Sequence, residues 1–213
     1  MKDIFSIIKS RRTCKQFKGS ITKDDLILLC EYASYAPSAG GMQDYRFIVS
    51  KDKQRMKLLP QLCMDQDHVS QAGGIIIVCS QPTMVEEYFP EQAKQFASQG
   101  ASAAIQNILL AAEGLGLGAA WIGGMIHSEV KKLYSIPEDV QLEAIIAIGH
   151  PYNKAEPKQS KQLGALLYYD DYGNPFQDIH ALKKDYSVKL EKKIESYEHR
   201  LQKIQNKLKG FFN

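Results

Sequence analysis

The sequence has 213 residues, of which 44% are hydrophobic and 24% carry a charge, as in an ordinary globular protein rather than a disordered or fibrous one. Its formal net charge is +3, and the positive excess falls after residue 184, so the chain lacks the basic stripe that nucleic-acid binding needs. Its apolar stretches are far shorter than the ~20 residues of a membrane span, so we expect a soluble, cytoplasmic protein without a membrane partner.

The first part of the chain predicts two helices around a short basic segment. Apolar residues at helical spacing predict a helix over residues 2–9. A second helix is expected to begin at Thr22, where Asp25 supplies the acid of a capping box. Residues 11–17, Arg-Arg-Thr-Cys-Lys-Gln-Phe, lie between the two and are called the basic segment below.

Three short runs of apolar, β-branched or aromatic residues predict strands over 45–49, 74–79 and 142–148. The second run is apolar throughout, as expected of a strand covered on both faces. Between the last two lies a helical stretch, 91–115, whose small residues permit close packing. Strands interleaved with helices predict a three-layer domain of the α/β or α+β class.

The basic segment suits a phosphate ligand. Arg11, Arg12 and Lys15 place three cations within five residues, and Thr13 adds a hydroxyl. A guanidinium can bind two phosphate oxygens at once, and a lysine amine can also reach a ring carbonyl. Taken alone, the segment fits a solvated helix end better, because positive charge is favoured near helix C-termini in any case.

Two further segments are rich in small residues. Residues 37–43, the small-residue loop, lie between a helix and a strand, where the backbone could approach a flat ring or form a plain surface turn. Residues 116–124 contain several glycines, but these follow a helix. A dinucleotide-binding glycine turn should follow a strand and open a helix, so that interpretation is rejected.

In this order and spacing, the three segments resemble the motifs of the nitroreductase family of flavoproteins. The resemblance covers about residues 1–173, and residues 174–213 are expected to form a C-terminal extension. It implies an α+β fold, a three-layer domain with a central mixed β-sheet flanked by helices, and FMN as the cofactor. For the first motif it implies contacts to the FMN phosphate, the ribityl chain and the pyrimidine edge from Arg11, Arg12, Thr13 and Lys15.

The second motif implies a homodimer with FMN at the subunit interface. In the family the small-residue loop contacts the flavin of the other subunit, which here assigns that role to Pro37, Ser38, Ala39, Gly40 and Gln43. The chain departs from the family pattern in two places. Gly41 stands where asparagine is common, and Asp44-Tyr45 stands where proline-tryptophan is common, which affects expected substrate preference more than flavin binding.

The third motif, residues 121–124, resembles the segment whose backbone amides lie against the ring near its hydride-accepting nitrogen. The resemblance assigns this role to Ile122, Gly123 and Gly124. Residues 148–151 resemble the family's strand-end signature, and Lys158 and Lys161 follow where basic residues complete the phosphate site.

The function implied is transfer of electrons from NADH or NADPH through FMN to a small electron-poor acceptor, a nitroaromatic or quinone, by a ping-pong mechanism. The cofactor performs the redox step, so no catalytic side chain is assigned. Two alternatives stay open. One is a divergent family branch that carries out reductive dehalogenation or flavin-ring cleavage, and the other is a non-catalytic FMN-binding or interaction protein.

The histidines and the four cysteines show no metal-ligand spacing, so no metal is expected and the thiols are predicted to be reduced. Cys14 lies among cations that could lower a thiol pKa, although a filler position is the preferred interpretation. Gln66 and His68 precede a strand, in a loop where family members sometimes contact the flavin edge.

The tail has a heptad pattern that predicts an amphipathic helix. The pattern fits equally a helix that packs on its own domain and one that packs on the other subunit. The resemblance favours the other subunit. Alternating steps of four and three residues separate Leu190, Ile194, Tyr197, Leu201, Ile204 and Leu208.

Overall fold

The computed structural model describes residues 3–153 and 163–175. It divides into two units, Met1–Pro157 and Lys158–Asn213. The described part of the second unit contains a 3-10 turn, Leu163–Ala165, and a bridge between Tyr168 and Pro175. The predicted C-terminal helix lies outside the described residues, so its packing and the expected boundary at residue 173 stay predictions.

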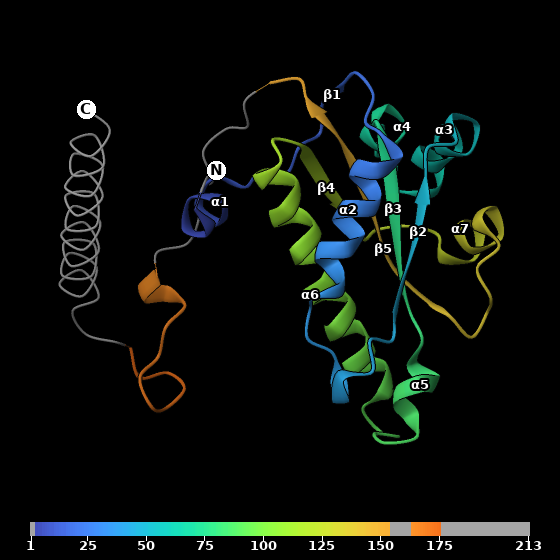
Figure 1. Cartoon of the computed structure of the whole chain (residues 1–213). Helices are drawn as coiled ribbons and strands as arrows, with labels where there is room; N and C mark the ends of the chain where they lie inside the picture. Colours follow the sequence, from blue (N-terminus) through green and yellow to red (C-terminus); the bar gives the residue numbers. More distant parts are fainter. Residues whose placement is uncertain (1–2, 154–162, 176–213) are drawn as a thin grey trace, which may run out of the picture. The chain divides into compact units, whose positions relative to one another are not determined.

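The first unit is built on a five-stranded sheet in the order β1-β5-β3-β2, with β4 also paired to β5 (Figure 1). The apolar runs form the central strands at their predicted places. Every ladder between the named strands is antiparallel, and the parallel component is a single bridge between Thr13 and Ala119. The strands are β1 Phe17–Lys18, β2 Tyr45–Ser50, β3 Gly74–Ser80, β4 Gly118–Ile122 and β5 Gln141–Pro151.

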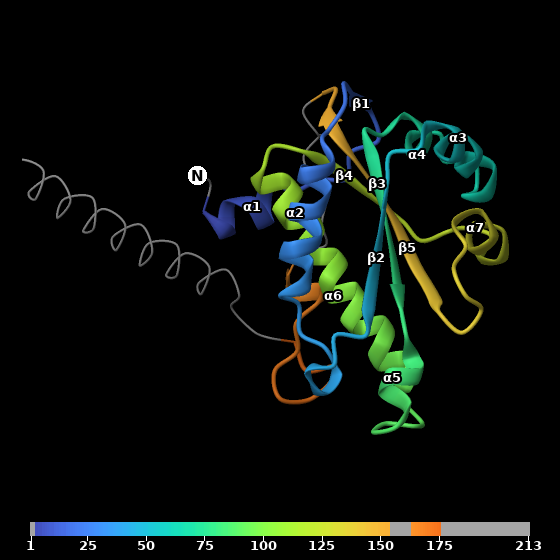
Figure 2. The same cartoon turned by 45° about the vertical axis from the view of Figure 1, so that its right-hand side comes forward.

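Helices cover both faces of the sheet (Figure 2). Side chains alternate between the faces, so Ile76 packs with α2 and α6 while Ile77 packs with α3 and α7. Both faces of β3 are therefore buried, which confirms the α+β class and the three layers. The helices are α2 Lys23–Ser34, α3 Lys53–Leu62, α4 His68–Gln71, α5 Pro82–Glu86, α6 Ala93–Gly114 and α7 His127–Tyr134.

Local sequence signals set the first two helices. α1, Ile4–Ser10, begins after Asp3, whose carboxylate accepts hydrogen bonds from two backbone N–H groups. The predicted capping box is present in α2, with Thr22 and Asp25 each binding the other's backbone N–H. None of the residues of α1 is buried, although its sequence is apolar.

The longest described helix, α6, has 22 residues and spans about 33 Å at 1.5 Å per residue. Its buried face consists largely of alanines, which let α2 and the sheet approach closely. None of the described helices combines the length and apolarity that crossing a bilayer requires.

Gly118 allows the basic segment to lie against β4. A Cβ at position 118 would be 2.6 Å from the Cys14 Sγ and 2.7 Å from the Cys14 Cβ. We expect Gly118→Ala to lower the free energy of unfolding by about 1–3 kcal/mol, the usual cost of overpacking, measured by urea denaturation.

Gly123→Ala is the control, because a Cβ there would meet Trp121 at an ordinary contact distance of 3.6 Å. Equal stability of the two variants would contradict the proposed packing constraint at Gly118.

Candidate functional site

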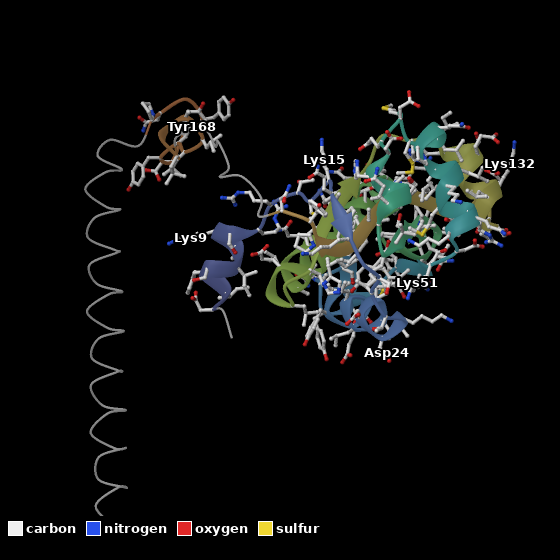
Figure 3. The ribbon with its side chains drawn as sticks, turned by 90° about the horizontal axis from the view of Figure 1, so that it is seen from above. Lys9, Lys15, Asp24, Lys51, Lys132 and Tyr168 are labelled. Carbon is white, nitrogen blue, oxygen red and sulfur yellow. The ribbon has the colours of Figure 1, made fainter. Side chains whose placement is uncertain are left out.

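The basic segment is fixed along the sheet by its backbone. The Cys14 N–H donates to the Ala119 carbonyl at 3.0 Å, and the Gln16 carbonyl accepts from the Tyr152 N–H at 2.9 Å. The following strand, β1, then pairs with the end of β5. Because the backbone is bound on the sheet side, Thr13 and Lys15 are left exposed, and Figure 3 shows Lys15 at the outer edge of this part of the chain.

The two arginines are half-buried and differ in their local contacts. Arg11 follows the last residue of α1. One guanidinium nitrogen of Arg12 donates to the carbonyls of Lys9 and Arg11, at 2.7 and 2.8 Å. Arg12 thus binds carbonyls at the C-terminal end of α1, the helix-end role that the sequence left open for these cations.

The third motif begins on the strand that binds the basic segment. Ile122, the last residue of β4, is buried, whereas Gly123 is exposed and Gly124 is half-buried. Met64 covers part of this motif, since a Cβ at Gly124 would be 2.8 Å from its sulfur. Through β4, the structure therefore links the first and third motifs within one chain.

The segment before β3, expected to be a loop, contains the short helix α4, which begins at His68, and this segment also reaches the region. His68 is buried, and its pKa is lowered first by that burial and then by the positive charge of Lys15. Gln66 donates a hydrogen bond to the Cys63 carbonyl at 3.0 Å. His68 is thus a neighbour of the basic segment, which the sequence could not establish because the two lie far apart along the chain.

The small-residue loop has a defined backbone with three left-handed residues. Gly40, Gly41 and Gln43 have φ values of 56°, 71° and 48°. The Ser38 hydroxyl accepts the Gln43 N–H at 2.8 Å, and the Gln43 side chain donates to the Ser34 carbonyl at 2.8 Å. The loop is therefore an ordered element rather than a loose surface turn.

This loop lies beside α5 and the N-terminal half of α6 (Figures 1 and 2). A hollow of about 350 Å³ lies between the loop and α6, beside Phe89 of the segment that follows α5. Its walls are mostly apolar and are formed by Pro37, Ser38, Ala39, Phe89, Phe96, Gln99, Gly100 and Ala103.

The structure does not bring the small-residue loop to the basic segment within one chain. The loop meets α6 at Gly100, whereas α1, which leads into the basic segment, meets α6 at Gly114. Fourteen residues of helix separate these contacts, which is about 21 Å along the axis. The basic segment and the small-residue loop therefore lie at different levels along α6.

The remaining candidate residues are the cysteines, possible metal ligands and the two later lysines. All four cysteines are free, and burial raises the pKa of Cys14 above its usual value, so its cationic neighbours do not activate it. The described residues contain no group of three or more His, Cys, Asp or Glu side chains that could hold a metal ion. Lys158 and Lys161 lie outside the described residues, so their predicted phosphate contacts stay predictions.

Comparison with known proteins identifies the family of this chain. The family model described as Nitroreductase family matches residues 8–71 and 61–150, which together cover more than half of the chain. The chain belongs to the nitroreductase family. All three predicted motifs fall inside the matched residues.

Two relatives and one solved structure illustrate the relationship. A provisionally named NADH dehydrogenase/NAD(P)H nitroreductase of Methanothermobacter thermautotrophicus is 32% identical over 70% of this chain and 78% of its own. An FMN reductase (NADPH) of Bacillus subtilis is 24% identical over 87% of this chain and 81% of its own. The NADPH:FMN oxidoreductase of Vibrio harveyi, solved with NAD+, shares the fold with a TM-score of 0.73 at 21% identity, over 87% and 85% of the two chains.

His68 should make stability depend on pH. Its folded-state pKa lies below the ordinary value of 6.5, so below that pH the unfolded chain binds a proton more readily than the folded one. Stability present above pH 6.5 should therefore be lost as the pH falls through the folded-state pKa. His68→Asn should lose less stability than the wild type between about pH 7.5 and about pH 5, in urea titrations.

His127→Asn, which removes an exposed imidazole, is the control for this comparison. The assignment fails if His68→Asn and the wild type lose stability in parallel.

Proposed function

We propose that this nitroreductase-family oxidoreductase binds FMN at sites built from two copies of the chain. It would pass electrons from NADH or NADPH to a small electron-poor acceptor such as a nitroaromatic or quinone. The observation that carries the proposal is the docking of the basic segment on β4, which leads directly to the exposed backbone of Gly123.

The residues of this region fit the cofactor's chemistry. Exposed Lys15 and Thr13 and half-buried Arg11 offer charge and a hydroxyl to a phosphate, at a segment whose backbone is already fixed. Beyond the end of β4, Gly123 presents backbone without a side chain, so a planar ring can approach closely. Backbone N–H groups there would stabilise negative charge on a reduced ring.

FMN, when bound, supplies the capacity to accept a hydride and pass electrons on. The chain's own task is to bind and orient the cofactor and to admit donor and acceptor in turn to one face. A single shared face predicts ping-pong kinetics. No side chain is assigned the role of nucleophile or base.

The distance along α6 supports the use of two copies. In one chain the contacts of α1 and of the small-residue loop lie about 21 Å apart along α6, so the loop is remote from the helix that leads into the basic segment. A second copy brings its own loop to the first copy's basic segment. The names of the B. subtilis and V. harveyi proteins, both linked to FMN and NADPH, agree with this cofactor and donor.

The cofactor proposal predicts a yellow protein. Purified full-length protein, reconstituted with FMN, should lose its visible absorbance on addition of NADH or NADPH in the absence of oxygen and regain it with a nitroaromatic or quinone. Absorbance spectra at each step provide the measurement. Protein that is colourless once unbound FMN has been removed would refute the proposal.

The phosphate contact predicts a loss of affinity. Arg11→Ala should weaken FMN binding by about 1.5–3 kcal/mol, the range for a hydrogen bond to a charged group, measured by fluorescence titration. Arg55→Ala is the control, because Arg55 is exposed on α3 and pairs with Asp52 at 3.3 Å. Equal affinities for the two variants would argue against the contact.

The two-copy site predicts complementation. Arg11→Ala and Gly40→Glu should each bind FMN weakly as homodimers, since each damages both sites. A mixed dimer of the two has one site with both halves intact and one with both halves altered. Titration of purified mixed dimers should therefore show one tight FMN per dimer, whereas sites built within single chains would show none.

A further inference from the structure

Asp44 is a buried carboxyl group between the small-residue loop and β2. Its relative exposure is 0%, and neither side-chain oxygen has a hydrogen-bond partner in another described residue. The backbone N–H of Asp44 itself favours the ionised form, but less than burial opposes it. Its backbone is nevertheless held in place, because its carbonyl accepts the Gln81 N–H at 2.9 Å. Since none of its surface is exposed, a molecule docking on the protein cannot supply a partner unless the surroundings move.

The carboxyl lies at the contact between the small-residue loop and α6. A Cβ built at Gly100 would lie 3.6 Å from the Asp44 Oδ1 and 3.7 Å from the Cα and Cβ of Ser38. Loop, helix and carboxyl thus meet at one point. Ser38 and Gly100 also form part of the wall of the 350 Å³ hollow, so the same contact shapes that surface.

The charged neighbours of Asp44 do not provide it with a hydrogen bond. Arg46 on β2 favours the ionised form, but its guanidinium donates to the carbonyls of Gln43 and Tyr45 and to the Met84 sulfur. Glu143 on β5 opposes ionisation by like charge. The small-residue loop carries no charged residue, and the α6 residues around Gly100, from 98 to 103, are uncharged.

Glu143 already accepts hydrogen bonds from the donors around it. Its carboxylate accepts hydrogen bonds from Ser80 at 2.5 Å, from Ser98 at 3.0 Å and from Gln141 at 2.9 Å. Of the two acids, Glu143 therefore has hydrogen-bond donors around its carboxylate, whereas Asp44 has none from another described residue. Burial, the largest influence, raises the pKa of Asp44.

An ionised carboxylate in this position can gain hydrogen bonds in only a few ways. Opening β2 would break a ladder of six residue pairs with β3. Displacing the small-residue loop would break its own few hydrogen bonds and the packing of Ala39 and Met42 against α5 and α6, but no strand ladder. Its left-handed Gly40 and Gly41 are already exposed. The loop is therefore the segment that is displaced when the ionised carboxylate becomes hydrated.

We propose that Asp44 is a proton-controlled lock on residues 37–43. As a neutral acid it lets the loop pack against Gly100, and as a carboxylate it draws the loop away from α6 toward water. This regulatory consequence rests on the proposed function, which places the loop at the flavin of a second copy. FMN binding should then weaken as Asp44 loses its proton.

The direction of the stability effect follows from the raised pKa. Asp44 in the folded chain holds its proton above the ordinary value of 3.8, where the unfolded chain has already released it. Its contribution is fully present below pH 3.8 and is lost as the pH rises through the folded-state pKa. Asp44→Asn keeps the shape without the titration, so it should retain stability where the wild type loses it.

The test is urea unfolding of the full chain across this pH range for the wild type and Asp44→Asn. The unfolding constant of the wild type relative to the variant should rise tenfold for each pH unit between the unfolded and folded pKa values. Asp24→Asn, which alters an exposed carboxyl in the first turn of α2, is the control and should give no such rise. Parallel curves for the wild type and Asp44→Asn would overturn the proposal.

Hydrogen exchange of the wild type keeps the test valid if Asp44→Asn does not fold. After correction for intrinsic exchange rates, amides in residues 37–43 should lose protection with rising pH while those of β2 and β3 keep theirs. Uniform protection, or loss shared by β2, would contradict a lock that acts on the loop.

FMN titrations of both proteins separate this inference from the proposed function. Affinity that falls with pH in the wild type more than in Asp44→Asn supports both. The pH-dependent difference in unfolding without FMN binding in either protein supports the lock and refutes the FMN proposal. Tight FMN binding with identical pH profiles in both overturns the regulatory consequence.

Discussion

Pairing to β5 is the constraint on which the candidate site depends. This strand hydrogen-bonds to β3, to β4 and, at its end, to β1. Two of these partners carry or continue a sequence motif, since the basic segment runs into β1 and residues 121–124 start at the end of β4. The relative position of the two motifs is therefore set by backbone pairing, through β5 and through the direct hydrogen bond from Cys14 to Ala119 of β4, not by contacts between their own side chains.

The helix α6 imposes the complementary constraint. It holds α1 near its C-terminal end and the small-residue loop near its N-terminal half, with a continuous helix between. A packed helix resists shortening, so the two groups cannot approach each other by local adjustment. Rigid separation of half-sites is a natural basis for an active site that requires dimerisation, as proposed for this chain.

Local signals were enough to predict the main elements from the sequence. The capping box of Thr22 and the continuous apolar runs of β3 and β5 depend on neighbours in the chain, and the structure has them where expected. The antiparallel ladders were not predicted, because strand direction depends on how the connections pass over the sheet. The helices α3 and α5 were not predicted, although the sequence offers Asp52 as an N-cap for α3 and Pro82 in the first turn of α5.

The site was predictable in its motifs but not in its details. The binding of Arg12 to backbone carbonyls and the burial of His68 near Lys15 depend on packing between segments distant in sequence. The same holds for Asp44, where sequence showed only a departure from a common proline, and burial results from α6, β2 and the loop together.

The pairing of Phe17 with Pro151 joins positions near the two ends of the first unit. Closing so long a loop has a large entropic cost, and contacts of this kind form slowly. During synthesis, β1 emerges from the ribosome long before its partner strand exists. The basic segment therefore lacks its final backbone partners until translation has passed the end of β5.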